Sequence, residues 1–446
     1  MSPPRRTNFR LTPDVSSKIV DVVALPKNGC IGEDELLAIL EEVVPKHPEV
    51  KIWNLSLGSD QPCDGQQFSE VAAALDALQD KFGVTFVLAA GNYRIPPLRG
   101  WPAEDLGEAD RLGVPADSVR GLAVGSLAHL DKPNTRVRRS EPSPFSRRGP
   151  GPVFLPKPDV VHYGGNCDSG GAFAQTGVLS INGSSQLAEN VGTSFSAPLV
   201  STLLANAEAS LVSPPSRSLL KALLIQSALL DSPTLSASEI RYRGFGVPGD
   251  LAAVLTCTPW SATLVFESRL LPGLEFEKWP FPIPDCLRRP DGRVFGEMVM
   301  TLAYEPSLDL SFGAEYCRTN VEASLGTYDV QADGKRHQVS QVPPEPKDVS
   351  RLYEAEQVAN AFKWSPVKVY RRQFSRGATG TDWRLRVEAS HRSGPVPTPT
   401  QDFAIVITLR DPGQSLPVYD EVVAKMAAAG WISQDLQIHH RVRSRL

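Results

Sequence analysis

Residues 191–200, VGTSFSAPLV, place a serine where it could act as a nucleophile. Ser194 follows Gly192 and Thr193 and opens an apolar helical pattern over 194–209. A serine hydroxyl becomes a good nucleophile when a neighbouring base, usually a histidine held by a carboxylate, takes its proton. Free N–H groups and the helix dipole at a helix N-terminus favour a developing negative charge. The pattern therefore predicts acyl-transfer chemistry at Ser194, with an oxyanion held at the start of its helix.

Alternating strand and helix patterns surround this serine. Short apolar or β-branched runs predict strands over 17–26, 51–58, 84–92, 121–127 and 158–164. Helical periodicity predicts helices over 32–44, 69–82, 194–209 and 218–230. This alternation is typical of an α/β fold, a mostly parallel sheet with helices on both faces.

Two turns at strand ends are candidates for the same site as Ser194. Ser56-Leu57-Gly58 ends one predicted strand, and Ala89-Ala90-Gly91-Asn92 ends the next. In parallel sheets the functional residues lie beyond the carboxyl ends of the strands, so both turns are expected at one edge. The side-chain amide of Asn92 and the N–H of Ser194 would then form an oxyanion hole with two donors.

The order of several short segments resembles that of subtilisin-like serine peptidases. These segments are NLSLG (54–58), VLAAGN (87–92), VRGLAVGSL (119–127), SPFSRRGPG (143–151), KPDVV (157–161), GTSFSAP (192–198) and GFG (244–246). The resemblance covers about residues 14–255. It implies attack of a serine on a peptide carbonyl, an acyl-enzyme, and hydrolysis of that intermediate.

The resemblance also implies a role for each candidate residue. Ser194 matches the acyl-forming nucleophile and Asn92 the side-chain oxyanion donor. The remaining matches are to the two walls of the substrate site, Ser56, Leu57 and Gly58 on one side and Ala89, Ala90 and Gly91 on the other. We expect no cofactor and assign no metal ligands.

Two of the three residues of the catalytic triad have no match in this sequence. The family order is Asp, His, Ser, with the Asp in a D-[ST]-G segment and the His in an HGT segment, and neither segment occurs here. We expect His47 at the opposite edge of the sheet, His129 in a polar loop, and His162 near the site in a structural or substrate-wall role. The other four histidines fall outside this domain. The chain alone is therefore expected to be inactive or incomplete.

Three explanations of the missing segments stay open. The chain could be a piece of a longer peptidase, an upstream segment having carried the Asp and His. A second chain could supply both residues. The chain could instead be a pseudoprotease that binds peptides as a regulatory module. The strand pattern at 17–26 resembles the family strand that follows the His helix, which favours the first explanation.

The pattern changes after residue 256. Strand-like runs occupy 262–270, 296–304, 367–374, 382–389 and 402–411, joined by Pro-rich connections, with helices expected over 351–362 and 417–430. We therefore predict a partial peptidase domain over 1–256 and an all-β, jelly-roll-like sandwich with inserted helices over 257–446. The first expected role of the region 257–446 is to stabilise the peptidase domain, and the second is to position substrate.

Composition narrows the classes of partner. The net charge is −4 in 446 residues, which argues against a general electrostatic grip on nucleic acid or on an anionic membrane. No run of 18 apolar residues and no signal-peptide pattern occurs, and the six cysteines have no CxxC or zinc-ligand spacing. We expect a cytoplasmic protein with reduced thiols that acts on a peptide or protein.

Overall fold

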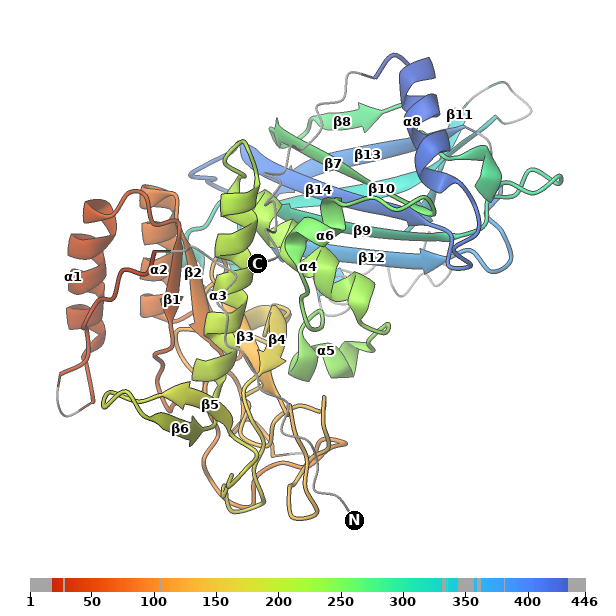
Figure 1. Cartoon of the computed structure of the whole chain (residues 1–446). Helices are drawn as coiled ribbons and strands as arrows, with labels where there is room; N and C mark the ends of the chain where they lie inside the picture. Colours follow the sequence, from red (N-terminus) through yellow and green to blue (C-terminus); the bar gives the residue numbers. More distant parts are fainter. Residues whose placement is uncertain are drawn as a thin grey trace, which may run out of the picture.

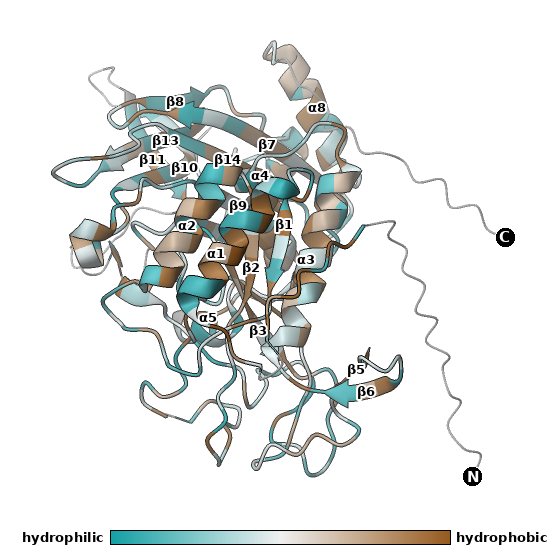
Figure 2. Ribbon diagram, turned by 90° about the vertical axis from the view of Figure 1, so that its left-hand side faces the viewer, coloured by the Kyte–Doolittle hydropathy of each residue, from teal (hydrophilic) through white to brown (hydrophobic). Residues whose placement is uncertain are grey.

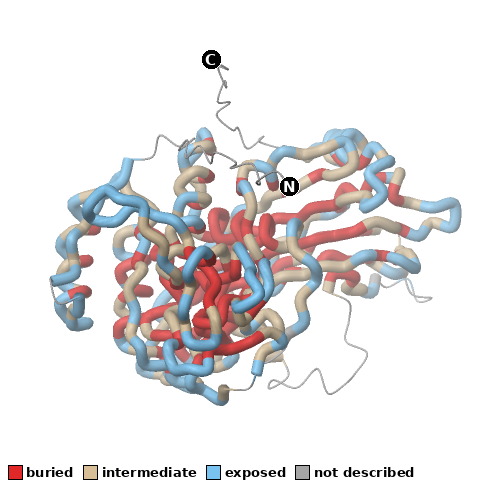
Figure 3. The backbone as a smooth tube through the Cα atoms, turned by 60° about the horizontal axis from the view of Figure 1, so that its bottom comes forward, coloured by how far each residue is buried: buried red, intermediate tan, exposed pale blue. Residues whose placement is uncertain are grey.

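The computed structural model contains an α/β part and a β-rich part with helix α4 (Arg217–Asp231) between them (Figure 1). Figure 3 shows buried backbone in the strands of both parts. The structure describes residues 18–26, 29–104, 106–330, 334, 336–343, 357–358, 362–380 and 382–431.

A parallel sheet forms the centre of the first part. Its strands lie in the order β1 (Ile52–Leu55), β2 (Thr85–Ala89), β3 (Leu122–Leu127) and β4 (Val160–Tyr163), and every pair is parallel. β2 and β3 are buried along their whole length, as expected for strands that are covered on both faces. The predicted α/β class is therefore confirmed.

Successive residues of these strands face two different apolar clusters. Phe86 and Leu88 belong to the cluster with α1 (Glu33–Val43) and α2 (Glu70–Phe82). Figure 2 shows these two helices side by side on that face. Val87 belongs to the cluster with α4 and α3 on the other face. This alternation with a period of two residues places helices on both faces of the sheet.

The remaining elements of the first part are short or connect the larger ones. The helices are α3 (Thr193–Ser210), α5 (Ala237–Arg243) and α6 (Leu251–Leu255), the strands are β5 (Val178–Ile181) and β6 (Leu187–Asn190), and the 3-10 turns are η1 (Val44–Lys46) and η2 (Pro152–Phe154). Ser69 caps α2, because its hydroxyl accepts a hydrogen bond from the N–H of Ala72.

The second part is a region of two antiparallel four-stranded sheets. One sheet has the order β11-β10-β13-β8 and the other the order β12-β9-β14-β7, and side chains of both contribute to one apolar cluster. The strands are β7 (Ser261–Leu270), β8 (Glu275–Lys278), β9 (Glu297–Tyr304), β10 (Thr319–Val330), β11 (Arg336–Val342), β12 (Val367–Gln373), β13 (Trp383–His391) and β14 (Gln401–Arg410). The helical segments are η3 (Asp285–Leu287), η4 (Leu310–Glu315) and α8 (Val418–Ala428).

Helix α4 packs against both parts of the molecule. Its apolar residues share a cluster with strands β2 to β4 and with Ala303 and Val406 of the antiparallel region. The buried amide of Gln226 donates to the carbonyl of Val299 at 3.1 Å and accepts from the hydroxyl of Thr301 at 2.7 Å. The division at residue 256 stays a prediction, and the side chains of α4 join the two sides of that division.

One predicted strand is wrong. Residues 18–26 have no regular secondary structure, and within the described part of the chain no strand pairs with them. A strand needs a hydrogen-bonding neighbour, which a β-branched run does not supply by itself. Only Val22 packs against the cluster under α1, while Ile19 and Val23 are 90% and 87% exposed.

The other differences are elements that the sequence patterns did not predict. These are β5, β6, α5, α6, β8, β10 and β11. Most of the helix expected over 351–362 lies outside the described residues.

Candidate active site

Ser194 lies in the first turn of α3, directly beside the turn that follows β1. Its hydroxyl donates a hydrogen bond to the carbonyl of Ser56 at 3.3 Å. In return, the hydroxyl of Ser56 donates to the carbonyl of Ser194 at 3.2 Å. These contacts position the Ser194 hydroxyl, and the residue as a whole is half-buried.

Thr193 connects the start of α3 to the turn after β2. Its N–H donates to the Asn92 Oδ1 at 3.0 Å, and its hydroxyl lies 3.3 Å from the same oxygen. The Thr193 hydroxyl also accepts from the N–H of Gly91 at 3.2 Å. Because the N–H of Thr193 needs an acceptor, the side-chain atom of Asn92 that faces it must be the oxygen and not the nitrogen. The Asn92 Nδ2 is then left as a donor.

Gly192 lies next to both predicted oxyanion donors. A Cβ placed at this residue would lie 3.4 Å from the Asn92 Nδ2 and 3.7 Å from the backbone nitrogen of Ser194. Its φ of +151° also favours glycine. Both nitrogens therefore lie near one point beside Gly192, at the N-terminus of an 18-residue helix.

The two predicted walls lie on either side of a third segment. The N–H of Gly113 donates to the carbonyl of Ala90 at 3.0 Å, and the N–H of Ser59 donates to the carbonyl of Val114 at 2.7 Å. Leu57 is half-buried and packs with Ala90 in the cluster under α1.

The remaining wall residues differ in exposure. Ser56 and Gly91 are half-buried, Gly58 is exposed, and Ala89 is buried. The structure thus brings every sequence-predicted site residue to one edge of the sheet, and their roles stay predictions.

The three histidines of the first part do not hydrogen-bond to Ser194 in the structure as described. His47 follows η1 and its Nδ1 lies 3.4 Å from the Glu49 carboxylate. Burial lowers the pKa of His129. Burial lowers the pKa of His162 to about 4, and its Nδ1 accepts from the N–H of Tyr163 at 2.9 Å. His162 is therefore neutral at pH 7 and holds its own backbone.

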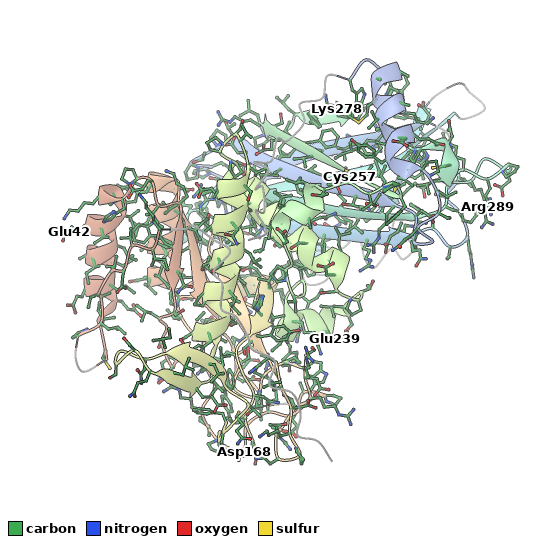
Figure 4. The ribbon with its side chains drawn as sticks, in the orientation of Figure 1. Glu42, Asp168, Glu239, Cys257, Lys278 and Arg289 are labelled. Atoms are coloured by element: carbon green, nitrogen blue, oxygen red, sulfur yellow. The ribbon has the colours of Figure 1, made fainter. Side chains whose placement is uncertain are left out.

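The acidic residue Asp168 shows a similarly local arrangement. It lies in a loop at the far end of the α/β part (Figure 4). Its carboxylate accepts from the N–H groups of Gly170 and Ala172, both at 2.9 Å, so it stabilises its own turn. Among the residues that the structure describes, the hydrogen bond of the Ser194 hydroxyl goes to a carbonyl and no histidine or carboxylate accepts it.

Thr193 is a site residue that sequence reasoning missed. It is fully buried and orients Asn92, although only Ser194 stood out in the GTS triplet. The sequence did contain a signal for Thr193: its hydroxyl stands directly before the candidate nucleophile, at the start of the predicted helix.

Other features bear on the class of protein. The described residues contain no group of three or more His, Cys, Asp and Glu side chains placed to hold a metal ion. In the same residues we find no helix that is long and apolar enough to cross a membrane. All six cysteines lie in described segments, and they form no disulfide.

Comparison with known proteins identifies the family. The model of the subtilase family, peptidase family S8, matches residues 14–247. The uncharacterized protein y4bN of Sinorhizobium fredii is 30% identical over 298 residues, which cover 57% of this chain and 67% of that protein.

Two solved structures illustrate the more distant likenesses. The patellamide maturation protease PatA has a TM-score of 0.37 and 22% identity over 51% of this chain and 69% of its own. The epidermin leader peptide processing protease EpiP of Staphylococcus aureus has a TM-score of 0.33 and 18% identity over 48% and 53%. Both TM-scores are low, so the assignment rests on the family match. This chain belongs to the subtilase family of serine peptidases.

Proposed function

We propose that this chain carries the nucleophile and the oxyanion hole of a subtilisin-type endopeptidase site. In this proposal Ser194 attacks the peptide carbonyl, and the Asn92 Nδ2 and the Ser194 N–H hold the oxyanion. The observation that carries the proposal is the proximity of both donor nitrogens to Gly192, because a Cβ there would lie within 3.7 Å of each of them. Loss of one oxyanion donor costs about 10²–10³ in turnover, a figure that was measured in subtilisin itself.

The base that activates Ser194 comes, in this proposal, from outside the described residues. The hydroxyl donates to the carbonyl of Ser56, which can orient the hydroxyl but is too weakly basic to take its proton. A peptide or protein would be the substrate, and a second chain or an upstream segment would supply the Asp and the His. The chain alone would then hydrolyse peptides slowly or not at all.

Hydrolysis of a peptide p-nitrophenyl ester with added imidazole tests this function. Imidazole can act as an external base, so we expect it to raise the rate above the rate with imidazole alone. The increase should disappear in Ser194→Ala and fall about 100-fold in Asn92→Ala. An increase that persists in Ser194→Ala would contradict the assignment of the nucleophile.

A pseudoprotease that binds peptides in a regulatory role is the alternative. The reciprocal hydrogen bonds between Ser56 and Ser194 favour it, because they satisfy the hydroxyl without a base. This alternative predicts equal peptide affinity for the wild-type chain and Ser194→Ala, and no increase in hydrolysis with imidazole.

We further infer that residues 257–446 form a β-sandwich domain that stabilises the peptidase part. Both antiparallel sheets contribute to one apolar cluster, and α4 lies against two strands of one sheet. Arg120 of the first part pairs with Glu305 at 2.7 Å, and both side chains are largely buried. These contacts support a stabilising role over a role in positioning substrate.

A further inference from the structure

Arg147 is a buried cation beside the proposed oxyanion donor. Only 5% of this residue is exposed. Its backbone N–H donates to the carbonyl of Gly91 at 3.1 Å, and the preceding residue, Ser146, forms an antiparallel bridge with Asn92. The side chain therefore starts at the turn that follows β2.

The guanidinium extends from this turn to the turn that follows β1. Its Nε lies 3.4 Å from the carbonyl of Asn92. Its Nη1 donates to the carbonyls of Arg111 at 2.7 Å and Ala109 at 3.1 Å, and its Nη2 donates to the carbonyl of Asp60. Four of its five N–H groups are thus used by backbone carbonyls, which leaves at most one for a substrate.

The methylene stem of Arg147 lies against Gly91 of one predicted wall and close to Gly113 of the segment that joins the two walls. A Cβ at Gly91 would lie 2.8 Å from the Arg147 Cδ, so any larger residue there would collide with the stem. A Cβ at Gly113 would lie 3.7 Å from the same atom and 2.7 Å from the carbonyl of Ser59. The stem therefore passes between the turn after β2 and the segment that connects the two walls.

The resemblance to subtilisin-like peptidases implies where a substrate side chain goes. When the attacked carbonyl lies beside Asn92 and Ser194, the side chain of its residue points between the walls at 56–58 and 89–91. On the basis of the proposed function, we propose that Arg147 is a specificity-determining residue that fills this space. The site then accepts glycine, alanine or serine at the attacked carbonyl and excludes aromatic and long aliphatic side chains.

Binding of labelled peptide aldehydes tests this proposal without requiring turnover. The peptides share one sequence and end in glycinal, alaninal, phenylalaninal or aspartal, and affinity is measured by fluorescence anisotropy on the full chain. Arg147→Ser opens the space, whereas Arg147→Lys keeps most of the stem and the charge as a matched control. Thermal unfolding of each variant shows whether it is folded.

We expect the wild-type chain to bind the glycinal and alaninal peptides at least about tenfold tighter than the phenylalaninal peptide. Arg147→Ser should bind the phenylalaninal peptide about tenfold tighter than the wild type does, and Arg147→Lys should keep the wild-type order. If Arg147→Ser does not fold, the order of affinities in the wild-type chain and in Arg147→Lys still tests whether aromatic side chains are excluded.

Three results would overturn the proposal. Equal affinity of the wild-type chain for the phenylalaninal and glycinal peptides would show that the space is open. Tightest binding of the aspartal peptide, lost in Arg147→Ser, would show that Arg147 recognises an acidic side chain. Binding of no aldehyde, or binding that Ser194→Ala leaves unchanged, would instead refute the proposed function and with it this inference.

Discussion

Replacement of Thr193 by valine should destabilise the fold and weaken the oxyanion site together. Valine has the shape of threonine but lacks the hydroxyl, which accepts from the N–H of Gly91 at 3.2 Å and lies 3.3 Å from the Asn92 Oδ1. Both bonds are long, so each should contribute about 0.5–1 kcal/mol. The N–H of Gly91 then lacks this acceptor in a poorly solvated place, which adds about 1 kcal/mol or more. We expect a total loss of about 2–3 kcal/mol.

Urea unfolding followed by tryptophan fluorescence measures this loss, and Thr193→Ser is the matched control because it keeps the hydroxyl. The same variants should be compared for affinity to a glycinal peptide. We expect Thr193→Val to lose about tenfold, because Asn92 keeps only the bond from the Thr193 N–H, whereas Thr193→Ser should stay close to the wild type. If Thr193→Val matches the wild type in both measurements, the Thr193 hydroxyl does not orient Asn92.

Three further predictions concern the site, its pH dependence and the contact between the two parts. Gly192→Ala should abolish imidazole-dependent ester hydrolysis, because its methyl group would lie 3.4 Å from the Asn92 Nδ2. Peptide binding away from the oxyanion donors should stay measurable. Unchanged hydrolysis would contradict this prediction. Burial lowers the pKa of His162 from 6.5 to about 4, so only the unfolded chain takes up this proton as the pH falls from 6.5 to 4. Stability should therefore drop by up to about 3 kcal/mol over that range, and urea titrations should show a smaller drop for His162→Gln. Gln226→Leu should cost about 2–4 kcal/mol in urea unfolding, because it removes three buried hydrogen bonds to the antiparallel sheet, and a loss below 1 kcal/mol would refute that role.

The sequence predicted the elements whose pattern is local. The runs at 84–92 and 121–127 became β2 and β3 because continuous apolar strands are typical of a sheet covered on both faces. The turns ending at Gly58 and Asn92 could be placed together because the carboxyl ends of parallel strands share one edge.

The errors concern features that depend on distant partners. Residues 18–26 have a strand-like composition, but a strand also needs a neighbour, which composition does not reveal. The strand β10 was missed because Gly326 interrupts its pattern. A Cβ at that position would lie 2.1 Å from the carbonyl of Val339, so the pairing with β11 requires a glycine that looks like a strand breaker in sequence.

The site residues show the same limit. Ser194 and Asn92 were predicted because their residue types and their positions at the ends of predicted elements can be read from the sequence. Thr193 and Arg147 were not, because their importance comes from the direction of their side chains in the folded chain. Arg147 lies 55 residues from Asn92 in sequence, and its side chain approaches the Asn92 carbonyl because Ser146 pairs with Asn92 in the folded chain.

Labelling of the full chain with a fluorophosphonate, read by mass spectrometry of the labelled peptide, tests the central claim most directly. The account predicts labelling at a background rate in buffer, a faster rate with imidazole, and modification of Ser194 alone. Asn92→Ala should slow the imidazole-dependent reaction about 100-fold. Labelling at another residue, or labelling that persists in Ser194→Ala, would contradict the account. Rapid labelling of Ser194 in buffer would show that a base within this chain already activates it.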